Sequence, residues 1–470
     1  MNDNPSSNVT WAGTRADAFL REIWTSLGGA AASVSTVSFA GAGDLPSAFA
    51  VSDLAAGCIA AAGLAVAELI AARGGARPSV HVDRRLASFW FGTTLRPLGW
   101  STPPPWDPIA GDYATADGWI RLHTNAPHHR EAALSVLRTP ADKDAVAAAV
   151  SRWRADDLEA AVVQAGGCAA TMRDLAAWAG HPHGQAVAAE PLAWIDHGDA
   201  APASDWTMVR GRPLAGIRVL DLTRVLAGPV ATRFLAGFGA DVLRIDPPGW
   251  DEPGVIPSVT LGKRCARLDL RNPGDRGVFD RLLASADVLV HGYRPDALAR
   301  LGLDAAARRR LRPGLVDVSL DAYGWSGPWR GRRGFDSLVQ MSTGIAAEGM
   351  RRFGTDRPKP LPVQALDHAT GYIMAAGAVR GLTRRLTEGV GSGTRTSLAR
   401  TATLLTTAPM LDRNEAFAEA GDADFDAATE ATTWGPARRM KPPLVVGGAG
   451  MRWDHPANEL GSSRPVWTER

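Results

Sequence analysis

Cysteine and lysine are both scarce in this chain of 470 residues. The three cysteines, Cys58, Cys168 and Cys265, lie far apart and show neither a CxxC pair nor zinc-ligand spacing. We therefore expect no disulfide framework and no metal site, and a reducing compartment fits such a chain. Arginine supplies almost all of the positive charge, but the formal net charge is only +2, which gives no indication of nucleic-acid binding.

Long apolar runs are also missing. No run reaches the roughly 18 residues that are needed to span a bilayer. The stretch 55–72 comes closest, but it is rich in alanine and is interrupted by Glu68, so we predict a buried helix there. The first ten residues, MNDNPSSNVT, lack the basic and apolar regions of a signal peptide. These features predict a cytoplasmic protein that does not associate with membranes.

A dinucleotide-binding motif is absent as well. The first predicted strand-to-helix turn reads L-A-G-P-V, without the pattern G-x-G-x-x-G. The tail carries Gly448 and Gly450, but Trp453 stands where the third glycine would be required. His123 and His291 belong to no cluster with metal-ligand spacing, and we interpret them as structural or surface residues. We therefore expect no permanently bound cofactor.

Alternating strands and helices are predicted between residues 206 and 320. Continuous apolar runs, which are typical of buried parallel strands, occur at 217–222, 241–245, 287–290 and 315–320. Helical stretches are predicted at 230–238 and 275–286. This alternation predicts an α/β fold with a Rossmann-like doubly wound sheet. Ligands of such sheets bind beyond the carboxyl ends of the strands.

The length of the chain predicts two or three domains. Residues 200–212 are polar and of mixed composition, as in a linker. We therefore predict an N-terminal part over 1–205 and an α/β domain over 206–410. The remaining residues, 411–470, begin with an acidic stretch and end in a Pro- and Gly-rich tail. We expect this C-terminal segment to pack back on the fold.

One motif occurs twice. D-L-A-A-G-C-I-A-A-A-G begins at Asp53, and D-H-A-T-G-Y-I-M-A-A-G begins at Asp367. Small residues three or four positions apart give a smooth helix face that another helix or a ligand can approach closely. Two interpretations stay open. The motif is an internal duplication, or both segments are alanine-rich helices with aspartate as a favoured N-cap residue.

Several further segments carry a resemblance to a known family. They follow one another in order over about 200 residues: P-L-A-G-I-R-V-L-D-L-T-R-V-L-A-G-P (213–229), G-A-D-V-L-R-I-D (239–246), L-G-K-R-C-A-R-L-D-L (261–270), A-D-V-L-V-H-G-Y-R-P-D-A-L-A-R-L-G-L (286–303), Y-G-W-S-G-P (323–328), G-F-D-S-L-V-Q-M-S-T-G (334–344) and the Asp367 motif. With these segments the chain resembles the class III CoA-transferases. That family includes formyl-CoA and carnitine CoA-transferases and α-methylacyl-CoA racemase.

The N-terminal part resembles the later half of the same family. The Asp53 motif is similar to the family's catalytic segment, and G-D-Y-A-T-A-D-G-W-I (111–120) is similar to the stretch that opens its small domain. The resemblance therefore implies a permuted or fused arrangement, in which residues 1–205 are a copy of the later half. A second, smaller α+β domain is expected at about 108–185.

The resemblance also implies a reaction. Class III enzymes move CoA from an acyl-CoA donor to a carboxylic acid through one aspartate, and Asp367 occupies the matching position. Its carboxylate would form a mixed anhydride, and CoA thiolate would convert this into an enzyme thioester that the acceptor acid opens. The start of a helix is expected to keep Asp367 ionised through the helix dipole. Asp53 follows no sheet-forming segment of the family type, and we interpret it as a structural cap.

CoA carries a pyrophosphate and a 3′-phosphate, so its pocket requires cations and backbone donors. The resemblance implies a site that consists of Val225, Leu226, Ala227, Lys263, Arg264, Arg294 and Arg300. Leu226 stands where formyl-CoA transferases often carry glutamine, so a formyl-type acceptor is not implied. CoA and acyl-CoA are expected as substrates, and the other substrate is a carboxylic acid.

Two other functions stay open. A racemase of this family uses a histidine and an aspartate, but Phe335 occupies the histidine position, and only His368 beside Asp367 favours this alternative. A non-catalytic CoA-binding partner protein is favoured by the permuted order and by the degenerate duplicate. Members of the family form interlocked dimers, so the resemblance implies a homodimer.

Overall fold

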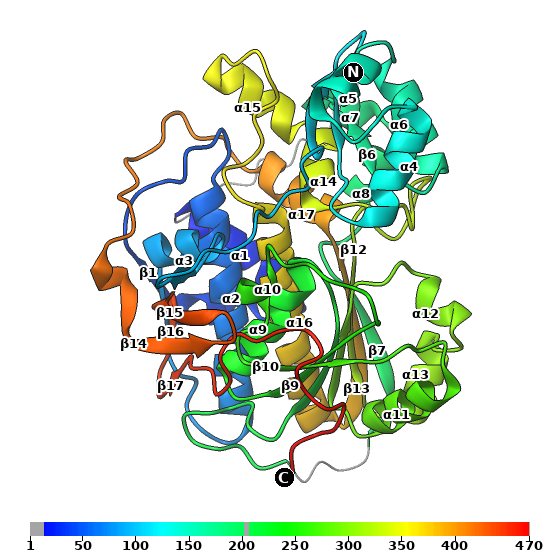
Figure 1. Ribbon diagram of the computed structural model, residues 1–470. Coiled ribbons are helices and arrows are strands. Elements are labelled where there is room, and N and C mark those ends of the chain that lie inside the picture. Colours follow the sequence, from blue (N-terminus) through cyan, green and yellow to red (C-terminus); the bar gives the residue numbers. More distant parts are fainter. Residues whose placement is uncertain (1–13, 202–205, 470) are drawn as a thin grey trace, which may run out of the picture.

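The computed structural model describes residues 14–201 and 206–469, and its centre is a seven-stranded sheet (Figure 1). The strands lie in the order β10 (Lys263–Arg267), β9 (Asp241–Asp246), β8 (Arg218–Leu222), β11 (Val288–His291), β12 (Val316–Asp321), β13 (Val390–Ser397) and β7 (Trp194–Ala200). All neighbours are parallel except β13 and β7. The order along the chain reverses between β8 and β11. A crevice for ligands is expected at such a switch point.

Helices cover both faces of this sheet (Figure 1). One face carries α9 (Ala227–Gly237) and α16 (Ala365–Glu388), and α2 (Val51–Ala72) packs on the outer side of α16. The other face carries α11 (Pro273–Ala284), α12 (Ala297–Arg300) and α13 (Ala305–Leu311). Because both faces are covered, all four residues of β11 are buried and apolar side chains dominate the strand.

The glycines of α16 let its neighbours come close. A Cβ atom on Gly371 would collide with the carbonyl oxygen of Ala227 in α9, and one on Gly377 would lie 2.7 Å from the side chain of Thr394 in β13. The small-residue face of the repeated motif is therefore the face through which α16 contacts α9 and the sheet.

Helix α2 contains the stretch 55–72. It is long and apolar enough to cross a bilayer, but 83% of its most apolar window is buried inside the protein. Helix α1 (Arg15–Ser26) and helix α16 pack against it. The predicted buried helix is confirmed.

A lobe built from residues 111–188 stands beside the carboxyl ends of the strands (Figure 1). Its antiparallel sheet consists of β4 (Gly111–Ala114), β5 (Trp119–Leu122) and β6 (Ala169–Thr171). Its helices are α4 (Pro127–Leu137), α5 (Lys143–Val150), α6 (Ala155–Gln164), α7 (Leu175–Gly180) and α8 (Pro182–Ala188). Three further helices connect the lobe to the large sheet: α14 (Asp336–Ser342), α15 (Ile345–Phe353) and α17 (Leu398–Thr407).

The C-terminal segment pairs with strands from the N-terminal part. β16 (Leu444–Val446) lies between β2 (Val80–Asp83) and β17 (Ala449–Gly450), and β1 (Val37–Ala40) flanks β2. β15 (Gly435–Met440) lies between β14 (Phe425–Thr432) and β3 (Leu95–Pro97). Four short helices complete the described fold: η1 (Ala31–Thr36), α3 (Arg84–Trp90), α10 (Ile256–Val259) and η2 (Asp422–Asp424).

The mixed α/β class predicted from the sequence is confirmed. One boundary differs from the prediction, because β7 lies before residue 205 but pairs with β13, so the large sheet crosses that boundary. The leader-free N-terminus predicted for residues 1–10 lies outside the described residues, as do positions 202–205 of the predicted linker.

Candidate active site at the carboxyl ends of the strands

A cavity of about 340 Å³ opens where β8 and β12 end, with Leu222, Leu320 and Asp321 on its lining. Further parts of the wall come from the turn after β8, Trp250, the segment after β11, residues 332–335, the starts of α16 and α17, and α4 of the lobe. Five of the residues predicted for the site line this cavity: Val225, Leu226, Ala227, Arg294 and Asp367.

Asp367 is the third residue of α16 and is only 7% exposed. Its backbone N–H donates to Oδ2 of Asp336 at 2.9 Å. Its own carboxylate oxygens accept no hydrogen bond from residues 14–201 or 206–469, although the residue lines the cavity. The side chain is therefore not an N-cap, and its carboxylate is available to a ligand.

The surroundings of Asp367 act against the predicted effect of the helix dipole. Burial, and next the charge of Asp336, raise the pKa of Asp367 well above its ordinary value. Burial also raises the pKa of Asp336 to about 6, although the hydrogen bonds that its carboxylate accepts from Asp367 and Gln340 act to lower this pKa. Two carboxyl groups in one buried site oppose each other's ionisation. A carboxylate of raised pKa is also a more basic nucleophile.

The turn between β8 and α9 forms one wall of the cavity. Val225 has φ 63°, a left-handed conformation that β-branched residues rarely adopt. Its N–H donates to Oε2 of Glu252 at 2.9 Å. No side chain of the described residues caps α9, so the start of this helix offers its positive end to the cavity.

A group of arginines surrounds the same cavity. Arg224, Arg294 and Arg333 line it, and none of the three forms an ion pair with a carboxylate in the described part of the chain. The Arg224 guanidinium lies over the ring of Trp250 at 4.5 Å from its centroid and donates to the Tyr293 hydroxyl at 3.1 Å. These uncompensated charges make the cavity suitable for an anion.

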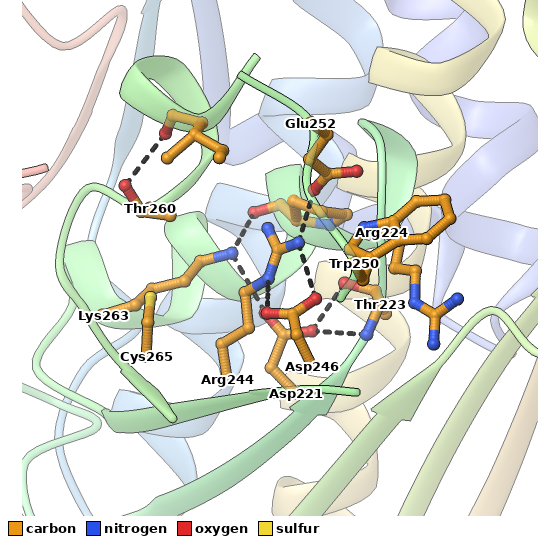
Figure 2. Close-up of polar contacts among 12 residues, drawn as sticks. Asp221, Thr223, Arg224, Arg244, Asp246, Trp250, Glu252, Thr260, Lys263 and Cys265 are labelled. Carbon is orange, nitrogen blue, oxygen red and sulfur yellow. Dashed lines mark hydrogen bonds and ion pairs between the residues drawn. The ribbon is translucent and has the colours of Figure 1, made fainter. Parts of the chain in front are cut away.

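The other three predicted cations lie elsewhere. Lys263 is fully buried, and its Nζ donates to Oδ2 of Asp221 and to a backbone carbonyl, both at 3.0 Å (Figure 2). Arg264 forms a bidentate pair with Asp241 at the amino end of β9. Lys263 is fully enclosed and does not line the cavity, so the predicted phosphate contact of Lys263 is wrong. Arg264 is partly exposed but lies away from the cavity, so its role stays a prediction. Arg300 is exposed at the end of α12 and does not line the cavity, so its role stays a prediction.

Asp53 is not a helix cap either. It is the third residue of α2 and pairs with Nε of Arg84 at 2.7 Å. The residues before the two repeated helices nevertheless share one backbone conformation, φ −76° and ψ 62° at Ala50 against φ −75° and ψ 66° at Gln364. The repeat is therefore structural as well as sequential. Of the two motif aspartates, Asp367 alone has a carboxylate without a partner among the residues that the structure describes.

Sequence reasoning missed polar groups on two other parts of the wall. His128 and His129 reach the cavity from α4, and burial lowers the pKa of His129 to about 4, so this imidazole is neutral. Burial raises the pKa of Asp321 to about 7. Asp321 ends strand β12, and the rule that ligands bind at the carboxyl ends of strands could have found it.

His368 does not reach the site. Its ring stacks on Phe91 at 5.3 Å, and it does not line the cavity. Burial, and next the charge of Arg233, hold the pKa of His368 well below its usual range. His123 is buried against Phe335 at 3.6 Å between ring centroids, and the predicted structural role fits this position.

Comparison with known proteins gives one family. The model of CoA-transferase family III matches residues 214–432. An acetyl-coenzyme A transferase of Hypoxylon pulicicidum is 33% identical over 206 residues, which are 43% of this chain and 34% of that protein. A probable fatty acyl-CoA transferase of Mycobacterium tuberculosis is 32% identical over 193 residues, which are 38% of this chain and 48% of that protein. These matches span half or less of each relative.

A crystal structure from M. tuberculosis matches 41% of this chain and 57% of its own, with 28% identity and a TM-score of 0.37.

Proposed function

Residues 214–432 belong to CoA-transferase family III, and from this premise we propose that the protein moves CoA from an acyl-CoA to a carboxylic acid, with Asp367 as the nucleophile. One observation carries the proposal. The Asp367 carboxylate lines a cavity at the carboxyl ends of the strands and has no hydrogen-bond partner among the described residues. The same cavity is lined by Arg224, Arg294 and Arg333, which form no ion pair in the described part of the chain. A nucleophile requires this freedom, whereas a structural aspartate has partners, as Asp53 does.

The proposed reaction has four steps that balance. The Asp367 carboxylate attacks the thioester carbonyl, and the C–S bond breaks. CoA departs as the thiolate, and the acyl group and Asp367 form a mixed anhydride. The thiolate then attacks the Asp367 carbonyl and releases the first acid. The acceptor carboxylate attacks the resulting enzyme thioester and expels CoA thiolate. This thiolate finally attacks the acyl carbonyl of the second anhydride, which gives the new acyl-CoA and restores Asp367.

CoA is proposed to lie across the large sheet, which we interpret as Rossmann-like and doubly wound. The uncapped start of α9 and the guanidinium groups of Arg224 and Arg294 are suited to its phosphates. The thioester would then reach Asp367, which lines the same cavity. Because the names of the relatives specify different acyl groups, the proposal is limited to a CoA thioester and a carboxylic acid.

The assembly is part of the proposal. We place the catalytic unit in residues 206–410 and the smaller domain at about 108–185, from a permuted or fused copy of the family's later half. The shared geometry before α2 and α16 supports the duplication. An interlocked homodimer in the cytoplasm completes the proposal, and the three free, buried cysteines suit a reducing compartment. A monomer in light scattering at micromolar concentration would contradict the dimer.

Racemisation is the weaker alternative. It requires a base beside the carbon next to the thioester carbonyl. The predicted histidine position is Phe335, and His368 packs against Phe91 outside the cavity. His129 lines the cavity, but its low pKa makes it a poor base.

Trapping of the enzyme intermediate tests the proposal. The protein is incubated with a panel of acyl-CoA donors and quenched with hydroxylamine, and the hydroxamate is located by mass spectrometry. We expect it on residue 367 in the wild type and in the matched control Asp53→Asn, and we expect none in Asp367→Asn. Full transfer activity in Asp367→Asn would refute the catalytic assignment. A wild type that binds CoA but yields no hydroxamate with any donor would support the non-catalytic alternative.

A further inference from the structure

Glu252 occupies a position between two unusual features. On one side is Val225, whose N–H donates a hydrogen bond to Oε2 of Glu252 at 2.9 Å. The φ of 63° at Val225 is strained for a β-branched residue. On the other side is Arg244, a fully buried guanidinium with which Glu252 forms an ion pair (Figure 2). The same carboxylate therefore joins a strained turn in the cavity wall to a charge inside the protein.

The partner charge is itself fixed. The Nε atom of Arg244 donates to Asp246 at 2.8 Å, and both side chains are fully buried. Arg244 and Asp246 belong to β9, so their positions are set by the hydrogen bonds of the sheet. Burial opposes the charged form of Arg244, but Glu252 and Asp246 raise its pKa well above the usual value, so the cation persists.

A second buried group holds the first residue of the turn. Oδ1 of Asp221 accepts from the backbone N–H of Thr223 at 2.9 Å and from its hydroxyl at 2.5 Å. Asp221 is held by Lys263 on its other oxygen. The turn is thus attached to the sheet at Thr223 through Asp221 and at Val225 through Glu252. Figure 2 shows Asp221 with Thr223, and Arg244 with Asp246 and Glu252.

The segment that carries Glu252 also builds the cavity. Trp250 lines the cavity and lies beneath the guanidinium of Arg224, which is the residue before Val225. A change in the Val225 conformation would therefore move an arginine, an indole ring and the start of α9 together.

We propose that Glu252 is a positioning residue that holds the Val225 turn in its strained conformation, so that the start of α9 and Arg224 face the CoA phosphates. The inference rests on the proposed function, because it takes CoA as the ligand of this wall. Glu252 does not touch the reacting atoms. Its effect is on CoA affinity rather than on the chemistry at Asp367.

The chain offers a matched control. Glu430 also pairs with a buried arginine, Arg439, at 2.8 Å, and its other oxygen accepts the backbone N–H of Ala457 at 2.8 Å. Neither Glu430 nor its partners line the cavity. Glu430→Ala therefore removes the same kinds of contact as Glu252→Ala, but away from the proposed CoA site.

The test combines calorimetry with CoA, steady-state kinetics and crystal structures of the variants. We expect Glu252→Ala to weaken CoA binding about tenfold and to raise the KM for acyl-CoA with a small change in kcat. Glu252→Gln keeps a hydrogen-bond acceptor for the Val225 N–H, so its CoA affinity should lie between those of the wild type and Glu252→Ala. Glu430→Ala should destabilise the protein without changing CoA affinity. Val225→Gly should restore affinity in the Glu252→Ala background, because glycine adopts positive φ without strain.

The crystal structure of Glu252→Ala without ligand separates the two proposals. The positioning role would be overturned if φ of Val225 stayed near 63° in this variant. It would also be overturned if the wild type bound CoA and the affinities of Glu252→Ala and Glu430→Ala were equal. A turn that relaxes while the wild type binds no CoA would support the attachment of the turn and refute the proposed function instead.

Discussion

Replacement of Lys263 by methionine distinguishes a CoA contact from a structural ion pair. The Lys263 ammonium and the Asp221 carboxylate are both fully buried and 3.0 Å apart. Methionine keeps the volume of the side chain but leaves the carboxylate without its cation. Removal of one partner of a buried pair costs about 3–5 kcal/mol, because an uncompensated charge remains in the interior.

The expected loss of unfolding free energy depends on pH, because it requires the Asp221 carboxylate to be ionised. Burial alone would raise the pKa of Asp221, but Lys263 and Arg244 hold that pKa below its usual value. The pair therefore stabilises the fold above the pKa of an unfolded aspartate, and this contribution is lost as the pH falls through the lower folded pKa. The difference between the wild type and Lys263→Met should be largest near pH 7 and should shrink in acid. Asp221→Asn in the same background should recover part of the loss.

Urea unfolding measures the free energy, and calorimetry below the unfolding midpoint measures CoA affinity. We expect the affinity of Lys263→Met to stay within about twofold of the wild type, because Asp221 still holds Thr223. A variant of unchanged stability with strongly weakened CoA binding would refute the buried-pair reasoning and would restore the phosphate contact.

Other expected outcomes concern the cavity and its supports. In Asp336→Asn the neighbouring charge is lost and the raised pKa of Asp367 falls, so the acidic limb of kcat/KM should move to lower pH; an unmoved limb would contradict coupling of the two groups. Gly371→Ala forces α16 away from α9 and should lower the free energy of unfolding by about 1–3 kcal/mol. An unchanged midpoint of urea unfolding would contradict this prediction. Arg294→Ala should weaken CoA binding by about 1–3 kcal/mol in calorimetry. The exposed Arg300 should matter less on replacement by alanine, and equal losses in both variants would place it in the site.

The strands of the large sheet were predictable where both of their faces are buried. The run predicted at 217–222 forms β8 over Arg218–Leu222, and the run at 241–245 forms β9 over Asp241–Asp246. β7 escaped prediction because it is an exposed edge strand, and its sequence W-I-D-H-G-D-A has no continuous apolar run. Its place is set by pairing with β13, which sequence periodicity does not encode.

The site was predictable in part for a similar reason. Residues next to each other in sequence, such as Val225, Leu226 and Ala227, were found because they share one turn. Lys263 was misjudged because its partner Asp221 lies two strands away, and only the strand order brings the two together. The raised pKa of Asp367 could not be predicted from the sequence, because its burial and the approach of Asp336 from another helix are both set by the fold.

The pairing of the C-terminal strands has a consequence for biosynthesis. Val82 pairs with Leu444, and Arg96 pairs with Arg438. During translation, the first strand of each pair is therefore made more than 300 residues before its partner. Contacts of such long range slow folding, and the nascent N-terminal part exposes unsatisfied strand edges until residues 435–446 have been made. Chains released before residue 435 should therefore be recruited by chaperones or aggregate rather than accumulate as folded fragments.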